Sequence, residues 1–146
     1  MSVKRVELRI STLSKQDPLW ADCSRIRQQV FIDEQQVPEA LEWDAADDTA
    51  VHLLAHYAHD AVACARVLPG GYIGRMAVLP AWRRRGIGEA MLLQAIQICR
   101  QWELSDVRLS AQRHAIGFYE QAGFVVCSEP YLDANILHVD MQLELI

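Results

Sequence analysis

The chain has 146 residues, of which 51% are hydrophobic and 23% are charged. This length and composition predict a single folded domain over residues 1–146 and exclude intrinsic disorder, because a chain of this size buries about 70% of its unfolded surface on folding. The formal net charge is −5 and the pI is about 5.5. Because nucleic-acid binding needs a basic face, these values argue against nucleic acid as a partner.

The charge is unevenly distributed along the chain. Residues 28–65 contain eight acidic residues and no Lys or Arg, whereas residues 66–100 contain six Arg and one acidic residue. Such segregation within a small domain suggests two surfaces that attract ligands of opposite charge.

The sequence has no predicted membrane or export segment. The first ten residues lack the apolar run of a signal peptide, and no stretch approaches 18 apolar residues. Cys23, Cys64, Cys99 and Cys127 lie far apart and are flanked by aliphatic residues, which is typical of inert, reduced cysteines in a core. We therefore expect a cytoplasmic protein that does not contact membranes.

The first half of the chain predicts strands around one helix. Alternating apolar residues over 6–10 predict a strand with one wet face. Asp17-Pro18 has the residue types of a helix start, and apolar spacings of three and four from Leu19 to Val30 predict an amphipathic helix that fades near residues 31–34. An acidic loop with a short helical turn follows, to residue 48. Three strands are then predicted over 52–57, 61–68 and 72–79.

The second half predicts two helices and three strands. The longest regular apolar pattern runs from Ile87 to Trp102 and predicts a helix, followed by a strand over 106–111. A short helix over 115–122 precedes Gly123, which suits a left-handed C-terminal position, and Phe124, which suits the hydrophobic contact of a Schellman motif. Strands over 124–128 and 136–144 complete a mixed α/β sheet.

The segment with the most specific chemistry joins the strand over 72–79 to the long helix. Gly86 and Gly88 stand at the start of that helix, where unpaired backbone N–H groups and the helix dipole favour an anion. Arg83, Arg84 and Arg85 add positive charge, although three consecutive arginines also occur as a solvated surface run. No Lys-Ser/Thr follows as in a Walker A loop, and the third glycine of a Rossmann fingerprint is absent.

Two motifs resemble those of the GNAT (GCN5-related) N-acetyltransferase family. Arg83-x-x-Gly86-x-Gly88 is similar to the acetyl-CoA signature, and Gly117-Phe118-Tyr119-Glu120-x-x-Gly123-Phe124 is similar to a second family helix. The predicted order of elements over nearly the whole chain is also the family's order. Two further segments, residues 26–35 and Glu42-Trp43-Asp44, resemble the small bacterial ElaA/YjcF-like branch.

This resemblance implies a GNAT fold and a binding site for acetyl-CoA. The fold would be a mixed, mostly antiparallel sheet of about seven strands, splayed in the middle and flanked by about four helices. The strand over 72–79 would carry a bulge, and its backbone at Met76, Ala77 and Val78 would bind the pantetheine arm and polarise the thioester. The pyrophosphate would bind at the loop and first helical turn formed by Arg83, Arg84, Arg85, Gly86, Ile87, Gly88 and Glu89.

The resemblance also implies catalytic residues. Tyr119 matches the family's general acid, which protonates the leaving thiolate, although its place on a helix is compatible with a purely structural aromatic. The amine would attack directly, without a covalent enzyme intermediate. Glu34 is our first candidate for a general base, on condition that partial burial raises its pKa. Gln112 stands near a position where many members have Asn, which leaves its role undefined.

Several residues are candidates for acceptor binding. Glu42 and Asp44 could attract a cationic amine, or could simply belong to a solvated loop. His114 and His138 could line the acceptor end of the site. His52 and His56 lie four residues apart, but a strand does not bring such a pair together, and we expect no metal.

The sequence therefore predicts an acetyl-CoA-dependent N-acetyltransferase. Its acceptor would be a primary amine of a small molecule or peptide, and exposed strand edges are compatible with a homodimer. The alternative is a non-catalytic acyl-CoA-binding regulatory module, which would need the anion site but neither Tyr119 nor an acceptor pocket.

Overall fold

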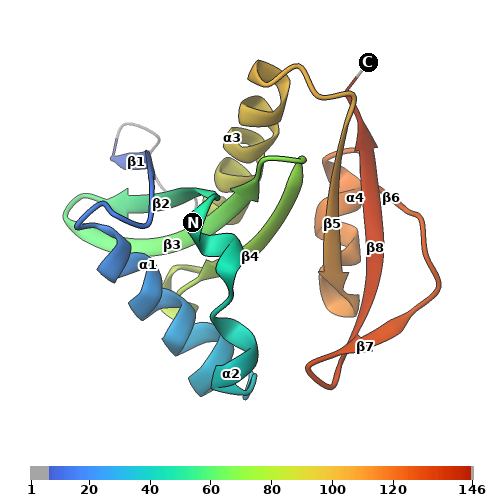
Figure 1. The fold of residues 1–146 in the computed structure, drawn as a ribbon. Coiled ribbons are helices and arrows are strands. Elements are labelled where there is room, and N and C mark those ends of the chain that lie inside the picture. The colour runs from blue at the N-terminus through green and yellow to red at the C-terminus, as the bar shows by residue number, and fades with distance from the viewer. Residues whose placement is uncertain (1–6, 146) are drawn as a thin grey trace.

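The computed structural model describes residues 7–145 and contains one eight-stranded sheet flanked by helices (Figure 1). The elements in chain order are β1 (Leu8–Leu13), α1 (Trp20–Arg27), the π-helix η1 (Gln28–Glu34), α2 (Glu39–Glu42), the 3-10 helix η2 (Ala45–Asp48), β2 (Val51–Tyr57), β3 (Asp60–Leu68), β4 (Tyr72–Val78), the 3-10 helix η3 (Pro80–Trp82), α3 (Ile87–Gln101), β5 (Asp106–Gln112), the 3-10 helix η4 (Arg113–Ala115), α4 (Ile116–Gln121), β6 (Val125–Val126), β7 (Tyr131–Asp133) and β8 (Ile136–Glu144).

The sheet is mixed and is divided in its middle. Its strand order is β1-β2-β3-β4-β5-β8-β6, with β7 paired to β8. All neighbouring strands are antiparallel except β4 and β5, which are parallel and pair only at Tyr72–Arg108 and Ile73–Leu109. Beyond these pairs the two strands part, as Figure 1 shows. The predicted mixed, mostly antiparallel sheet, splayed in the middle and flanked by four α-helices, is confirmed.

Strand β3 lies between two hydrophobic cores, which explains its unbroken apolar sequence. One core contains Ala63, Ala65 and Val67 together with the buried face of α3. The other contains Cys64 with Cys23 and other buried residues of α1. Alternate residues of one strand thus face helices on opposite sides of the sheet.

A bulge interrupts β4 opposite Ala65. Cys64 pairs with Ala77 and Arg66 with Gly74, so two residues of β4, Arg75 and Met76, stand opposite one residue of β3. Arg75 accordingly has a φ of 48°. The bulge bends β4 at the place where it leaves β5, which is the local cause of the division in the sheet.

The first helix differs from the prediction at both ends. It begins at Trp20, and Asp17 Oδ1 instead accepts a hydrogen bond from the Leu19 backbone N–H at 2.9 Å. Its continuation is a π-helix, a rare form that inserts an extra residue per turn and is frequent at functional sites. The first strand runs to Leu13, and Val6, predicted to belong to it, lies outside the described residues.

The predicted Schellman motif after α4 is confirmed. Gly123 has a φ of 100°, its N–H donates to the Glu120 carbonyl, and the Phe124 N–H donates to the Tyr119 carbonyl. The rings of Tyr119 and Phe124 lie 6.0 Å apart. This motif fixes the end of the helix that carries Tyr119.

Strand β7 was not predicted, because it has only three residues and shows no periodic pattern. It forms a hairpin with β8 in which Asp133 pairs with Ile136. Ala134 and Asn135 make the turn with φ values of 51° and 63°, as a two-residue hairpin requires. The Asn was a weak signal for this turn, since it has no following Gly.

The acidic segment after η1 is held against the sheet by buried ion pairs. The Arg27 side chain is 1% exposed and donates to Glu42 Oε2 and to Asp47 Oδ1, at 2.8 Å each. Asp47 also accepts a bond from Arg66, at 2.9 Å. The Arg27 guanidinium holds the pKa of Asp47 below its usual range despite burial. A charge this deep is tolerated because each partner is paired.

We predict that Arg27→Leu lowers the free energy of unfolding by about 3 kcal/mol, because two buried carboxylates lose their most buried cation and Glu42 and Asp47 each keep only one other arginine, Arg75 and Arg66. Urea denaturation measures this loss. The matched control is Arg25→Leu on the same helix. The pair of Arg25 with Asp22 is exposed, so its loss should lower the free energy of unfolding by less than about 1 kcal/mol. Equal effects of the two substitutions would show that the buried pairs do not stabilise the fold.

Candidate functional site

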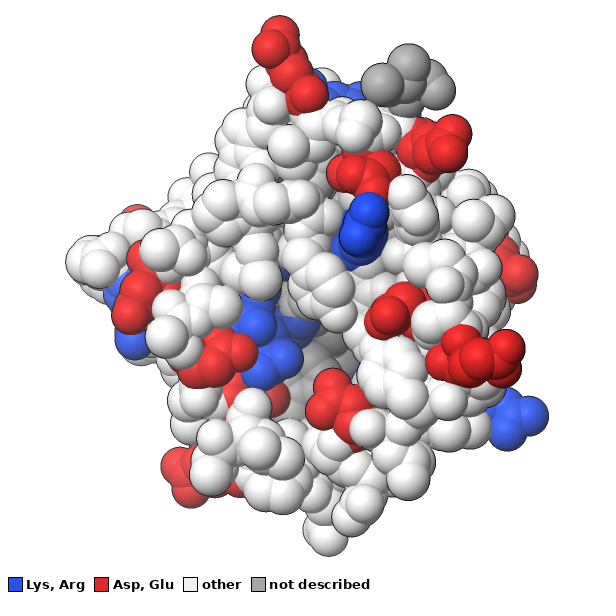
Figure 2. Space-filling model, turned by 45° about the vertical axis from the view of Figure 1, so that its right-hand side comes forward, with Lys and Arg blue, Asp and Glu red and all other residues white. Residues whose placement is uncertain are grey.

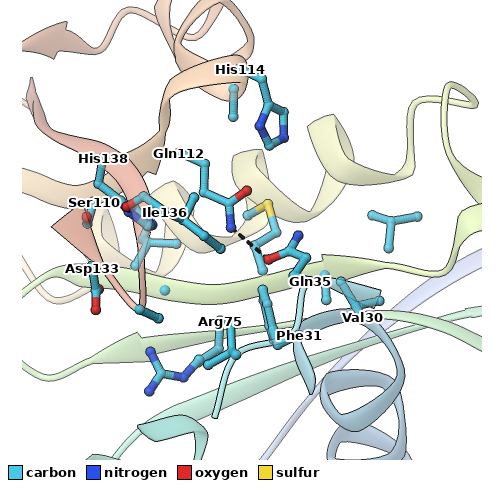
Figure 3. Close-up of a pocket in the computed structure, with 18 of the residues that line it drawn as sticks. Val30, Phe31, Gln35, Arg75, Ser110, Gln112, His114, Asp133, Ile136 and His138 are labelled. Atoms are coloured by element: carbon cyan, nitrogen blue, oxygen red, sulfur yellow. Dashed lines mark hydrogen bonds between the residues drawn. The ribbon is translucent and has the colours of Figure 1, made fainter. Parts of the chain in front are cut away.

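A cleft of about 880 Å³ opens where β4 and β5 part. It is lined by the bulged half of β4, by η1 and α2 on one side, and by β5, α4 and the β7–β8 hairpin on the other (Figure 3). Tyr72 and Ile73 lie at its closed end and Arg83 and Gly88 at its open end. The site therefore exists because two neighbouring strands stop pairing.

One edge of the cleft consists of backbone groups of β4. The N–H of Leu79 donates to Val62 of β3 at 2.9 Å, so it points away from the cleft. Backbone groups of alternate residues point to opposite sides of a strand, which directs those of Met76 and Val78 toward the open side. The Val78 carbonyl is occupied there by Arg83 Nε at 2.9 Å. The N–H of Val78 and the backbone of Met76 are left as candidates for hydrogen bonding to a ligand.

The start of α3 has the geometry of an anion site. Gly86 is the N-cap residue, has a φ of 84°, and forms no side-chain cap. A Cβ at Gly88 would lie 3.5 Å from the Phe118 ring and 3.8 Å from the Val78 side chain, inside the cleft. No side chain caps the first N–H groups of this 15-residue helix, and a Cβ at Gly86 would meet nothing within 4 Å. These residues fit a bound pyrophosphate.

The three arginines before Gly86 have different surroundings. Arg85 stacks on Trp82 at 5.0 Å from the ring centre. Arg84 is exposed and has a φ of 63°. Arg83 donates to both carboxylate oxygens of Glu34 at 2.7 Å, in addition to its bond to Val78. Arg83 thus braces the loop against η1 and β4, which leaves Arg84 and Arg85 as the arginines available to an anion.

Glu34 lies in the cleft, but the condition for its predicted role as a general base is not met. Its bidentate pair with Arg83 holds the pKa of the carboxyl below its usual value, whereas the prediction required a raised pKa. The side chain is also 38% exposed. The prediction followed its position after α1 and could not include Arg83, which is 49 residues away.

Tyr119 faces the cleft from α4, beside Phe118 at 5.1 Å between ring centres. Burial raises the pKa of its hydroxyl to about 12. The hydroxyl consequently keeps its proton at physiological pH and acts as a donor.

The acidic segment does not present the free carboxylates that were expected. Glu42 borders the cleft, but its side chain is 3% exposed and bonded to Arg27. Asp44 is not a lining residue and pairs with Arg66 at 2.6 Å and Arg75 at 3.2 Å. In Figure 2, a group of basic side chains lies at the hollow in the molecule, with acidic side chains directly beside it. The strong charge of the segment is thus largely neutralised by residues distant in sequence.

Two amides meet across the cleft, and both predicted histidines line it. Gln112 of β5 donates to Gln35 at 2.8 Å, drawn as a dashed line in Figure 3. Gln112, whose role the motif left undefined, therefore joins the two walls. His114 and His138 are both lining residues, and His138 Nδ1 lies 2.7 Å from the Ile136 carbonyl.

The sequence reasoning missed several polar residues of the cleft. Arg75 enters it from the bulge, Ser110 from β5, and Asp133 from the short strand β7. Figure 3 shows Ser110, Asp133 and His138 at one end of the cleft. No sequence motif marks these residues, because the bulge and the hairpin that position them were not predicted in detail.

The remaining candidate residues lie outside the cleft. Cys23, Cys64 and Cys99 are buried, and burial raises the pKa of Cys23 to about 12. Cys127 is exposed, so the expectation of four core cysteines was wrong for this one, which directly follows the exposed two-residue strand β6. Within residues 7–145 there is no group of three or more side chains suited to a metal ion. No helix in this range is long and apolar enough to cross a membrane.

Comparison with known proteins places this geometry in a family. Residues 11–145 match the family model described as "Acetyltransferase (GNAT) domain". The chain is 30% identical over 130 residues to the protein ElaA of Escherichia coli, an alignment that covers 84% of this chain and 85% of ElaA. It is 29% identical over 135 residues to "Uncharacterized N-acetyltransferase YjcF" of Bacillus subtilis, with 90% and 96% coverage.

Solved structures agree. The crystal structure of an acyl-CoA N-acyltransferase from Pseudomonas aeruginosa has a TM-score of 0.81 at 32% identity, covering 93% of this chain and 99% of that one. For Escherichia coli ElaA the TM-score is 0.84 at 27% identity, with 94% and 99% coverage. The chain belongs to the GNAT family of acetyltransferases. Within that family it is an ElaA/YjcF-like acetyltransferase, as its motifs suggested.

We predict that Glu34→Gln leaves kcat within about threefold of wild type and raises the KM for acetyl-CoA by less than tenfold. The substitution removes one half-exposed ion pair, whose contribution to the stability of the loop before α3 is about 1 kcal/mol or less. Steady-state thiol release with varied acetyl-CoA separates the two constants. A hundredfold fall in kcat with an unchanged KM would instead restore Glu34 as the general base.

Proposed function

We propose that this protein transfers the acetyl group of acetyl-CoA to a primary amine of a small molecule or peptide. The observation that carries the proposal is the continuity of one cleft, from the uncapped start of α3, past the open edge of β4, to a polar pocket at the other end. An extended donor with an anionic end fits this path. An acceptor would enter from the polar end.

The donor would be bound mainly by backbone groups. The N–H groups at the start of α3, with Arg84 and Arg85, would hold the pyrophosphate. The open edge at Met76 and Val78 would bind the pantetheine arm, with Ala77 between them anchored in the core on the opposite side. One fixed N–H aimed at the thioester oxygen would stabilise the negative charge that develops there on attack.

Tyr119 would donate its hydroxyl proton to the leaving sulfur. With a tyrosine pKa of about 12 and a thiol near 8.5, complete transfer costs about 5 kcal/mol. Tyr119 is therefore best suited to donate a hydrogen bond that stabilises the thiolate. Full transfer of its proton to the sulfur would require that the tyrosine oxygen receive another proton in the same step. After attack, the nitrogen carries one proton more than the amide product needs, and the loss of this proton offsets the proton that the thiolate takes up. Acetyl transfer would then need no covalent enzyme intermediate.

The acceptor end combines charges of both signs. Arg75 and Asp133 line it together with the two histidines, so an acceptor with a cationic amine and a second polar group fits it. A homodimer and a cytoplasmic location remain predictions from the sequence. The non-catalytic acyl-CoA-binding module would share the start of α3 and would make no use of Tyr119.

We predict that Tyr119→Phe lowers kcat at least tenfold and leaves the affinity for acetyl-CoA nearly unchanged, because only the hydroxyl is lost. Thiol release with a panel of primary amines measures kcat, and calorimetry measures binding. Tyr57→Phe is the matched control, since its hydroxyl bonds Glu7 away from the cleft. Unchanged turnover in Tyr119→Phe would remove this residue from the mechanism, and absence of turnover in wild type would favour the binding module.

A second prediction concerns the anion site. Gly86→Glu should abolish acetyl-CoA binding in calorimetry, because it places bulk and negative charge beside the proposed pyrophosphate. Gly70→Glu, in an open turn outside the cleft, controls for the added charge. Gly86→Asn tolerates the left-handed backbone and separates strain from charge, so it should bind more tightly than Gly86→Glu. Normal binding by a folded Gly86→Glu protein would contradict the proposed site.

A further inference from the structure

Three side chains form a hydrogen-bonded row behind the acceptor end of the cleft. The hydroxyl of Tyr131 donates to Asp140 Oδ1 at 2.5 Å, and the same hydroxyl oxygen contacts Ser110 Oγ. A tyrosine hydroxyl has one proton, and here it points to Asp140. The Ser110–Tyr131 bond must therefore be donated by Ser110. Both bonds of the row thus run in one direction, from Ser110 toward the carboxylate.

The sheet holds this row in place. Ser110 and Asp140 are directly opposite each other on β5 and β8. Both backbone groups of Asp140 are bonded, since its N–H donates to Ser128 Oγ at 2.8 Å and its carbonyl accepts from the Cys127 N–H at 2.9 Å. Tyr131 reaches in from β7 and stacks on His138, with 6.1 Å between ring centres. The short strand β7 therefore serves to place one hydroxyl between two residues of the main sheet.

Only the first member of the row lies where an acceptor would bind. The last paired residue of β5 at the division of the sheet is Leu109, so Ser110 is the first residue past the point where β4 and β5 part. Ser110 lines the cleft, whereas Tyr131 and Asp140 do not. Ser110 is labelled in Figure 3 at the polar end, near Asp133 and His138. A proton entering at Ser110 could reach Asp140 without crossing solvent.

Asp140 also differs electrically from the acidic residues of the other wall. Glu34, Glu42 and Asp44 are all paired with arginine. Asp140 forms no ion pair with any residue between 7 and 145, so no fixed cation competes for its charge. Burial and the bond to Asp140 raise the pKa of Tyr131 to about 12. Tyr131 therefore stays protonated and can pass a proton on without acting as the base itself.

We propose that Asp140 accepts the proton that an acceptor ammonium must lose before attack, through Ser110 and Tyr131. The acceptor N–H bond breaks and its proton joins Ser110 Oγ, while the serine proton moves to the Tyr131 oxygen and the tyrosine proton to Asp140 Oδ1. The products of this step are a neutral amine and a neutral carboxyl group. After the product leaves, the carboxyl returns its proton through Tyr131 and Ser110 to water that enters the emptied cleft. This inference rests on the proposed acetyl transfer to an amine.

The test compares kcat, KM and acetyl-CoA affinity in three variants, with thiol release from acetyl-CoA and a panel of primary alkylamines as the probe. Asp140→Asn keeps an oxygen that can accept the Tyr131 bond but cannot take up a proton, and Tyr131→Phe removes the middle hydroxyl. Ser110→Ala removes the first hydroxyl. Each should lower kcat at least tenfold, with KM and acetyl-CoA affinity within threefold of wild type, because base catalysis contributes 10²- to 10⁴-fold in general.

A combined variant separates a relay from structural damage. Residues that act as one path lose their function together, so Tyr131→Phe/Asp140→Asn should be no slower than the slower single variant. Ser110→Thr, which keeps a hydroxyl, should retain most of the rate lost in Ser110→Ala. Glu144→Gln is the matched control, since it removes an exposed carboxylate from the same strand, β8, that lies outside both the cleft and the row.

The outcomes separate the relay from the proposed function. If wild type releases thiol but Asp140→Asn keeps its kcat within threefold, the relay is wrong and acetyl transfer stands. The relay is equally wrong if the effects of the Tyr131 and Asp140 substitutions multiply, or if Glu144→Gln lowers kcat as much as Asp140→Asn does. If wild type releases no thiol with any amine, both the proposed function and the relay fail.

Discussion

The parting of β4 from β5 after two residue pairs leaves backbone groups of both strands without a strand partner. Such groups are costly to bury unless something else satisfies them. Strands β2 and β3, by contrast, are hydrogen-bonded to a neighbouring strand on each side. The bulge at Arg75 is the local distortion that allows the division, and a ligand that brings its own amide groups can replace the missing strand. The cleft is thus an interruption of strand pairing that the rest of the fold keeps open.

The cost of this division is offset by contacts on either side of it. On one wall, the pair of Glu34 with Arg83 ties η1 to the loop before α3. Across the gap, the two glutamine amides meet at 2.8 Å. A single amide hydrogen bond contributes only about 1 kcal/mol, so this contact can give way to a ligand at little expense. The stronger ion pairs lie within one wall of the cleft. The weaker Gln112–Gln35 contact is the one that spans the gap, where a ligand would have to displace it.

The sequence was most informative where local rules decide the outcome. The Schellman motif at Gly123 follows from residue types and spacing and is confirmed, and the unbroken apolar run of β3 fits its place between two cores. The two motifs also predicted the family. What could not be predicted are pairings between distant residues. The acidic segment was expected to be a charged surface, yet arginines from α1, β3 and β4 neutralise much of it.

The same limit applies to the choice of a general base. Glu34 was singled out for its place in the chain, whereas the structure pairs its carboxylate with Arg83, which lowers its pKa. Ser110, Tyr131 and Asp140 belong to three separate strands, and only the register of the sheet brings them into one row. A carboxylate's neighbours decide its chemistry, and such neighbours are a property of the tertiary structure.

The exposure of Cys127 has a practical consequence. The other three thiols are buried, with pKa values raised by that burial, so a thiol-directed reagent should modify the folded protein at one position. The Cys127 N–H bonds the carbonyl of Asp140, at 2.9 Å. A fluorophore or spin label attached there would sit on the backbone beside the polar end of the cleft. A label on the natural Cys127 would thus report ligand binding without an engineered cysteine.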